Sequence, residues 1–160
     1  MASGRVALVR LHDRPFAFGG PDPYGGPVTV EPARFGGRPD VELVVVVDCR
    51  SLDRSAAFWS GVLGYRAEPS SPGRYQQLLP ADGVGIEVLL QQVPETKAGK
   101  NRVHLDLRVP DLAAEVTRVT ALGAQCLTAE PIEEYGWTWH VLADPDGNEF
   151  CVLQPPPVTR

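Results

Sequence analysis

Two side chains in this sequence are suited to acid–base chemistry, and both lie in strand-like stretches. Glu87 stands in the apolar stretch 85–92, where an unpaired buried carboxylate is costly, so it needs a partner or solvent. His104 alternates with Asp106 and Arg108, which places it on the polar face of its strand. A carboxylate and an imidazole within reach of one ligand atom could move a proton next to a carbonyl. The alternative is a solvated carboxylate and a structural, hydrogen-bonded histidine.

The three cysteines are an odd number and form no C-x-x-C pair. Cys49, Cys126 and Cys151 therefore argue against both a disulfide framework and a structural zinc knuckle. We expect them to be reduced and to pack as small apolar side chains. Nothing in the sequence indicates an activated nucleophile among them.

A pair of tryptophans alternates along one predicted strand near the C-terminus. Trp137 and Trp139 share a face with Val141, while His140 and Thr138 share the other. If the Trp pair faces a cleft, it offers flat apolar area for an aromatic or polyketide-like ligand. If it faces the helices, it belongs to the core. The sequence leaves both arrangements open.

Composition excludes several classes of partner. Fifteen Lys and Arg against twenty Asp and Glu give a net charge of −5, without a run of like charge, so a nucleic-acid partner is not expected. The longest apolar run, 43–47, is too short to cross a membrane, and the N-terminus lacks the apolar segment of a signal peptide. We therefore expect a cytoplasmic protein with one core.

Residues 1–40 predict a Pro/Gly-rich N-terminal extension rather than a domain. They hold seven of the sixteen Gly and six of the sixteen Pro, so about a third of the segment is Gly or Pro. These residues disfavour regular helices and strands. Short strands at 6–11 and 28–30 are the elements expected there. The periodic part of the chain, 41–155, is expected to be one domain, and 156–160 a tail.

The first part of this domain, 41–93, shows the order β-α-β-β-β. The apolar, β-branched run at 41–48 predicts a buried strand. Ser51 can cap a helix that ends at Gly64, because the apolar residues between them recur on one face. Three further strands are expected at 65–68, 75–79 and 85–92.

The second part, 101–155, shows the same order. A strand is predicted at 103–109, and Asp111 can cap a helix that Gly123 closes. Three further strands are expected at 125–129, 137–143 and 149–153.

The two parts also match residue against residue. The Leu-Gly pairs that end the predicted helices, at 63–64 and 122–123, are 59 residues apart, and the Asp-Gly turns at 82–83 and 146–147 are 64 apart. A unit this small cannot bury both faces of its sheet. We therefore predict an α+β fold in which two βαβββ modules form a curved mixed sheet around a cleft, with the helices outside. The turn at 144–147 is expected to be a hairpin turn whose Pro and Gly set the backbone, with no chemical role.

Several motifs resemble those of the vicinal oxygen chelate superfamily, which has the glyoxalase/bleomycin-resistance/dioxygenase fold. The resemblance covers 41–155, and NRVHLDL and GNEFC are similar to segments of bacterial glyoxalase-like proteins. This fold hosts isomerases, epimerases, dioxygenases, thiol transferases and drug-sequestering proteins, so the resemblance implies no single reaction. The motifs are AAFW at 56–59, VLGY at 62–65, NRVHLDL at 101–107, DPDGNEF at 144–150 and GNEFC at 147–151.

The resemblance also implies where a metal would bind. Metal-using relatives place four inward-facing ligands, typically His or Gln, Glu, His and Glu, at positions that match Val44, Glu87, His104 and Cys151 here. Val44 has no lone pair, and the Cys151 thiol replaces the hard carboxylate that magnesium, manganese or ferrous iron prefers. We therefore expect the usual site to be degenerate. The remaining metal ligands, Glu87, His104 and Cys151, form a mixed set that zinc could accept with a water.

Three kinds of function follow, of which the third, an interaction module that docks through the N-terminal extension, rests only on the composition of that extension. The first is a binding protein that holds a small organic molecule without the usual metal, and the absent donor at Val44 favours it. The second is a lyase, isomerase or dioxygenase acting on a carbonyl or aromatic metabolite, with Glu87 and His104 as catalytic residues or with a divalent metal. The resemblance also implies a homodimer. The expected ligand-binding residues are Val44, Trp137, Trp139 and Cys151.

Overall fold

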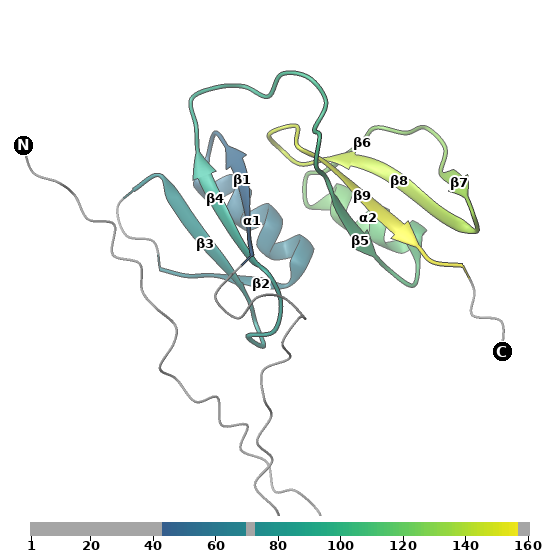
Figure 1. Ribbon diagram of the computed structural model, residues 1–160, viewed down its shortest axis with the longest axis horizontal. Coiled ribbons are helices and arrows are strands. Elements are labelled where there is room, and N and C mark those ends of the chain that lie inside the picture. Colours follow the sequence, from purple (N-terminus) through teal and green to yellow (C-terminus); the bar gives the residue numbers. More distant parts are fainter. Residues whose placement is uncertain (1–42, 70–72, 157–160) are drawn as a thin grey trace, which may run out of the picture. The chain divides into compact units, whose positions relative to one another are not determined.

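A computed structural model describes residues 43–69 and 73–156 of the chain (Figure 1). These residues belong to one compact unit, Val41–Arg160. The strands predicted at 6–11 and 28–30, and the predicted tail except Pro156, lie outside the described residues. Neither described helix combines the length and the apolar character that a membrane crossing requires.

Module one has the predicted β-α-β-β-β order. Its sheet order is β1-β4-β3-β2, in which β1 runs parallel to β4 and the other neighbours are antiparallel. The α1 helix packs against β2, β3 and β4 (Figure 1). The elements are β1 (Val44–Cys49), α1 (Leu52–Leu63), β2 (Tyr65–Ala67), β3 (Tyr75–Pro80) and β4 (Glu87–Gln92).

Module two has the same topology with one additional strand. Its sheet order is β5-β9-β8-β6, in which β5 runs parallel to β9, and β7 pairs with the outer part of β8. The sequence did not predict β7, because its three residues are all exposed and carry no apolar alternation. The elements are β5 (Leu105–Arg108), α2 (Leu112–Ala121), β6 (Gln125–Cys126), β7 (Ile132–Glu134), β8 (Trp137–Ala143) and β9 (Glu149–Gln154).

The predicted caps Ser51, Asp111 and Gly64 are confirmed, whereas the C-terminal cap of α2 is Leu122, one residue before the predicted Gly123. The Ser51 side chain accepts a hydrogen bond from the Arg54 amide at 3.4 Å, and Asp111 accepts one from the Ala114 amide at 3.0 Å. Gly64 follows α1 with φ of 68°, a left-handed conformation that glycine adopts without strain. Local sequence therefore sets where both helices begin and where α1 ends.

Each helix covers one face of its own sheet. In module one Val47, Val88 and Leu90 are buried on the helix side, and in module two Phe150 and Val152 are. Successive strand residues point to opposite faces, so their neighbours lie on the face away from the helix, here called the open face. Strand pairing among the described residues stays within each module, so the predicted mixed sheet is built as two sheets.

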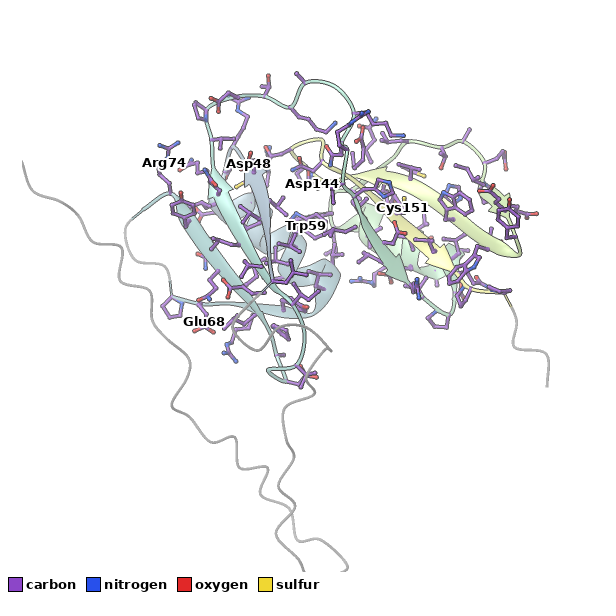
Figure 2. All side chains as sticks on the ribbon, viewed as in Figure 1. Asp48, Trp59, Glu68, Arg74, Asp144 and Cys151 are labelled. Carbon is purple, nitrogen blue, oxygen red and sulfur yellow. The ribbon has the colours of Figure 1, made fainter. Side chains whose placement is uncertain are left out.

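The two modules share one core at α1. The ring of Trp59 packs against Phe150 with centroids 5.4 Å apart, and Phe58 contacts Phe150 edge-on at 6.1 Å. The indole N–H of Trp59 donates to Oδ2 of Asp144 at 3.1 Å, and both residues are buried. Figure 2 labels this pair and shows it between the first and second sheets. The two modules therefore share a buried core within this chain.

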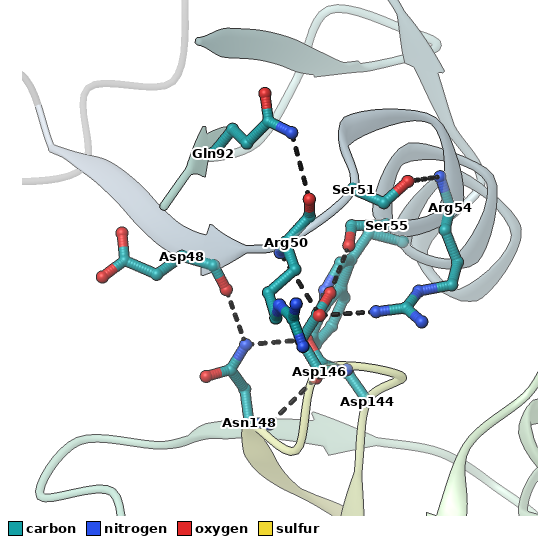
Figure 3. A network of polar contacts seen from close by, with 10 residues as sticks. Asp48, Arg50, Ser51, Arg54, Ser55, Gln92, Asp144, Asp146 and Asn148 are labelled. Atoms are coloured by element: carbon teal, nitrogen blue, oxygen red, sulfur yellow. Dashed lines mark hydrogen bonds and ion pairs between the residues drawn. The ribbon is translucent and has the colours of Figure 1, made fainter. Parts of the chain in front are cut away.

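The Asp144–Gly147 turn holds the start of α1 through a second carboxylate (Figure 3). Oδ1 of Asp146 accepts from the Arg54 guanidinium at 2.5 Å and from the Arg50 amide at 3.2 Å. Its Oδ2 accepts from the Ser55 hydroxyl at 2.8 Å. Negative charge near a helix N-terminus is stabilising. Beyond setting the backbone, this turn therefore docks module two on module one, a role that the sequence did not predict.

The C-terminal end of α1 is held by a residue of the other helix. The Arg118 guanidinium donates to the carbonyls of Gly61 and Val62 at 2.8 and 2.9 Å, and it pairs with Glu115 on its own helix. A cation near the last carbonyls of a helix complements the helix dipole. Both ends of α1 are thus bound by module two.

We predict that Asp146→Ala lowers the free energy of unfolding by about 2–3 kcal/mol, because it leaves three donors at the module interface without their charged acceptor. Urea denaturation followed by circular dichroism measures the change. The matched control is Asp82→Ala in the corresponding turn of module one, where the carboxylate accepts from the Val84 amide in an exposed turn. Equal losses in both variants would contradict a docking role for Asp146.

Candidate functional site

The open face of module two gathers most of the predicted functional residues. Phe150 and Val152 face α2, so the residues that alternate with them on β9 point away from it. Their ladder partners on β5 and β8 share this face. The residues concerned are His104, Asp106 and Arg108 at β5, Glu149, Cys151 and Leu153 on β9, and Trp137, Trp139 and Val141 on β8.

Three of these side chains form a cluster of potential metal ligands. Nδ1 of His104 lies 3.3 Å from Oδ1 of Asp106 and 3.8 Å from Sγ of Cys151. All three ligand atoms lie within 4.8 Å of one another. Among the described residues, this is the group of three or more His, Cys, Asp or Glu side chains that is close enough to hold a metal ion. Asp106 and Cys151 are direct ladder partners on the adjacent parallel strands β5 and β9, so backbone pairing holds them together.

The Cys151 thiol is not an activated nucleophile. Burial, followed by the charge of Asp106 and a hydrogen bond to it, raises the pKa of this thiol to about 11. The protonated form therefore dominates near neutral pH. This agrees with the sequence, which indicated no reactive cysteine.

Trp137 and Trp139 lie on the open face rather than in the core. Trp139 is the ladder partner of Leu153, and both tryptophans are half-buried. The Arg108 guanidinium carbon lies 5.0 Å from the centre of a Trp137 ring, a cation–π contact. Of the two arrangements that the sequence left open, the structure has the one in which the rings face away from α2.

Val44 and Glu87 form a separate pair on the open face of module one. They are direct partners in the parallel β1–β4 ladder, and both are half-buried. The neighbouring open-face residues, Val46 and Leu89, are apolar. No hydrogen bond or ion pair within the described residues joins Glu87 to His104 or Cys151. The structure thus brings the four predicted positions together as two pairs, one on each sheet.

A pocket of about 440 Å³ lies beside His104, where both modules contribute edge strands. Trp59 is among its lining residues, together with polar groups that the sequence did not single out. These groups come from separate segments that only folding brings together, so spacing gives no signal for them. The lining residues are Val45, Val46, Val47, Asp48, Trp59, Asn101, Val103, His104, Leu105, Asn148 and Glu149.

Glu149 is the charged group fixed most firmly in this pocket. Its carboxylate accepts from the Asn101 amide at 2.6 Å and pairs with Lys97 at 3.2 Å. The hydrogen bond from the Asn101 backbone amide, together with the hydrogen bond and charge of Lys97, lowers the pKa of Glu149 below its ordinary value. Glu149 is therefore ionised near neutral pH.

The donor atoms do not fit an octahedral hard-metal site. Such a site wants several oxygen or imidazole donors. At the four expected positions, Val44 offers none, and Cys151 offers sulfur. His104, Asp106 and Cys151 form a different, one-module donor set that excludes Glu87.

Two βαβββ modules with open sheet faces define a fold of the glyoxalase/bleomycin-resistance/dioxygenase class, within the vicinal oxygen chelate superfamily. A family model described as "Glyoxalase-like domain" matches residues 44–153. The chain belongs to this glyoxalase-like family, which confirms the resemblance seen in the motifs. No relative is found among curated proteins by sequence.

Solved structures show the same fold at low sequence identity. A glyoxalase/bleomycin resistance protein/dioxygenase family enzyme from Burkholderia phytofirmans is 22% identical, with a TM-score of 0.58, and the match covers 69% of this chain and 95% of that one. The fosfomycin resistance protein FosX from Mesorhizobium loti is 21% identical, with a TM-score of 0.56 and coverages of 72% and 92%. A mutant FosX from Listeria monocytogenes, complexed with Mn(II) and a dihydroxypropylphosphonic acid, is 15% identical, with a TM-score of 0.58 and coverages of 71% and 88%.

We predict that Cys151 reacts slowly with iodoacetamide at about pH 8 and faster as the pH approaches 11, because its raised pKa keeps the thiol protonated. Asp106→Asn removes one cause of the shift and should accelerate the reaction at about pH 8. Asp53→Asn, at an exposed acid in the first turn of α1, is the control and should not. Peptide mass spectrometry follows the modification, and alkylation of Cys151 at the rate of a free cysteine would refute the prediction.

Proposed function

We propose that this protein binds a small organic molecule with a flat apolar part, and that it does so without the octahedral metal of its metal-using relatives. The observation that carries the proposal is the placement of Trp137 and Trp139 on the open face, beside the His104 cluster. Two half-buried indole rings on one strand offer a stacking surface. The expected ligand-binding residues are Val44, Trp137, Trp139 and Cys151.

The chemistry of the surrounding side chains supports an amphipathic ligand. Along β8 the open face is apolar, with Trp139 followed by Val141. Along β5 it is polar, with Asp106 followed by Arg108. Binding sites combine apolar walls with a few polar groups that set orientation. A ligand with one apolar side and one polar side would match both strands.

The second candidate is an enzyme of the lyase, isomerase or dioxygenase kind. The observation that favours it is the 3.3 Å contact between His104 and Asp106. A carboxylate that fixes the orientation of an imidazole is the arrangement of a general base with its positioning group. In this candidate His104 and Glu87 are catalytic residues acting on a carbonyl or aromatic metabolite.

We further propose that the protein acts as a cytoplasmic homodimer. The three cysteines are free, as expected in a reducing compartment. Val46 and Val103 are 52% and 82% exposed beside the 440 Å³ pocket, and large exposed apolar side chains are typical of contact surfaces.

The binding proposal is tested with the fluorescent probe anilinonaphthalene sulfonate, which has flat rings and an anionic group. We predict that Trp139→Ala weakens binding about tenfold, because ring stacking is worth about 0.5–1.5 kcal/mol beyond area. Tyr135→Asn removes a 92% exposed aromatic residue at φ of 51°, which Asn tolerates, and should leave affinity unchanged. Equal affinities for the wild type and Trp139→Ala would count against the open face as the binding surface.

The enzyme candidate is tested by deuterium incorporation from heavy water into hydroxyacetone, followed by NMR. If it is correct, we predict that Glu87→Gln slows exchange at least about 100-fold, the usual contribution of a general base. The free energy of unfolding should change by less than about 0.5 kcal/mol. Glu95→Gln, at an exposed site in the loop after β4, is the control. An equal exchange rate in Glu87→Gln would exclude Glu87 as the base for this probe.

A further inference from the structure

We propose that module two alone forms a tetrahedral zinc site from His104, Asp106 and Cys151, with a fourth position open to water or ligand. Two of these residues occupy positions where metal-using relatives place ligands. The third ligand is Asp106 of the same sheet, in place of Glu87 of module one. The inference goes beyond the binding proposal and does not depend on it.

The two separations that involve His104 are close to those of a tetrahedral zinc ion. Zinc binds His nitrogen and carboxylate oxygen at about 2.0–2.2 Å and thiolate sulfur at about 2.3 Å, so a tetrahedron places nitrogen and oxygen about 3.4 Å apart and nitrogen and sulfur about 3.6 Å apart. The corresponding separations here are 3.3 Å for His104 to Asp106 and 3.8 Å for His104 to Cys151. The third separation, between the Asp106 carboxylate and the Cys151 sulfur, is within 4.8 Å, so these two side chains would close around the ion.

The backbone holds two of the ligands in place. Asp106 and Cys151 are partners in the β5–β9 ladder, and β9 is an inner strand with neighbours on both sides. His104 directly precedes β5. Because all three lie in or directly beside adjacent strands of one sheet, the site does not require any movement between modules.

The donor chemistry selects zinc rather than a hard metal. One imidazole, one carboxylate and one thiolate form a mixed set that zinc accepts, whereas magnesium and manganese prefer oxygen donors in octahedral geometry. The side chains of His104 and Asp106 are 44% and 46% exposed, so a fourth ligand has access from solvent. A ligand stacked on Trp139 would stand one ladder position along the same face from Cys151.

The test is a titration of the chelator-treated full-length protein with Co²⁺ as a spectroscopic substitute for zinc. We expect one equivalent to bind with the intense visible absorption of tetrahedral cobalt and with a sulfur-to-cobalt charge-transfer band, and Zn²⁺ to displace it. A weak octahedral spectrum, or no binding at micromolar concentrations, would overturn the proposal. So would stoichiometric magnesium, manganese, nickel or iron in protein purified without a chelator.

Variants separate this ligand set from the one that the sequence predicted. Asp106→Asn, at a half-exposed position that should not disturb folding, is expected to weaken Co²⁺ binding at least about tenfold, since even outer-shell changes cost about 10–100-fold. Cys151→Ser should remove the charge-transfer band. Glu87→Gln should leave affinity unchanged, and loss of binding there would favour the set with Glu87 instead.

A last control addresses adventitious binding. Cys126 and His140 form the other cysteine–histidine contact in the described chain, at 3.5 Å on the α2 side of the sheet. Cys126→Ser should leave the Co²⁺ spectrum unchanged. Equal affinity in the wild type and in the Asp106 and Cys151 variants would show an adventitious ion only and would refute the site.

Discussion

The hydrogen bond from the Trp59 indole to the buried Asp144 carboxylate is the contact on which the rest of the structure depends. Each module has one helix for a two-faced sheet, so neither can bury its apolar surface alone. Trp59 joins the cores through Phe150, and Asp144 satisfies its N–H. The same carboxylate accepts the amides of Asp146 and Asn148, so the shape of the turn and the module contact form one network. Such buried networks stabilise only when every member is satisfied.

The two modules have the same strand arrangement but carry different side chains at corresponding positions. Val44 and His104, at or just before the first strand of each module, are 60 residues apart, and Glu87 and Cys151, in the last strands, are 64 apart. In module one the open face is mostly apolar around Glu87. In module two it carries an imidazole, carboxylates, a guanidinium and a thiol. The two sheets therefore offer different chemistry to a ligand, although the same backbone ladder presents it.

The open face of module two is polar along one strand and apolar along another. Polar side chains follow the edge strand β5, and indole rings follow β8, with Cys151 and Leu153 of β9 between them. Helices cover the opposite face, so the apolar residues there are unavailable to a ligand. A molecule on this surface is thus expected to align its polar side with the strand edge that borders the 440 Å³ pocket.

The sequence by itself determined the local structure. Ser51, Asp111 and Gly64 fix the helix ends through hydrogen bonds and dihedral preferences that act within a few residues, and the similar offsets between motifs, 59 to 64 residues, revealed two modules. The alternation of Trp137 and Trp139 fixed which residues share a face. These features depend on residues close together in the chain, so residue types and spacing are enough to predict them.

Tertiary structure alone decided how these pieces meet. Asp106 joins His104 and Cys151 because β5 and β9 pair in one particular register, and a shift of one residue would turn Asp106 to the other face. Glu87 lies on the sheet of module one, beside Val44. Asp146 and Ser55 are 91 residues apart in the chain and meet only when the modules dock. Contacts of this kind depend on strand register and module packing, which residue types and spacing do not encode.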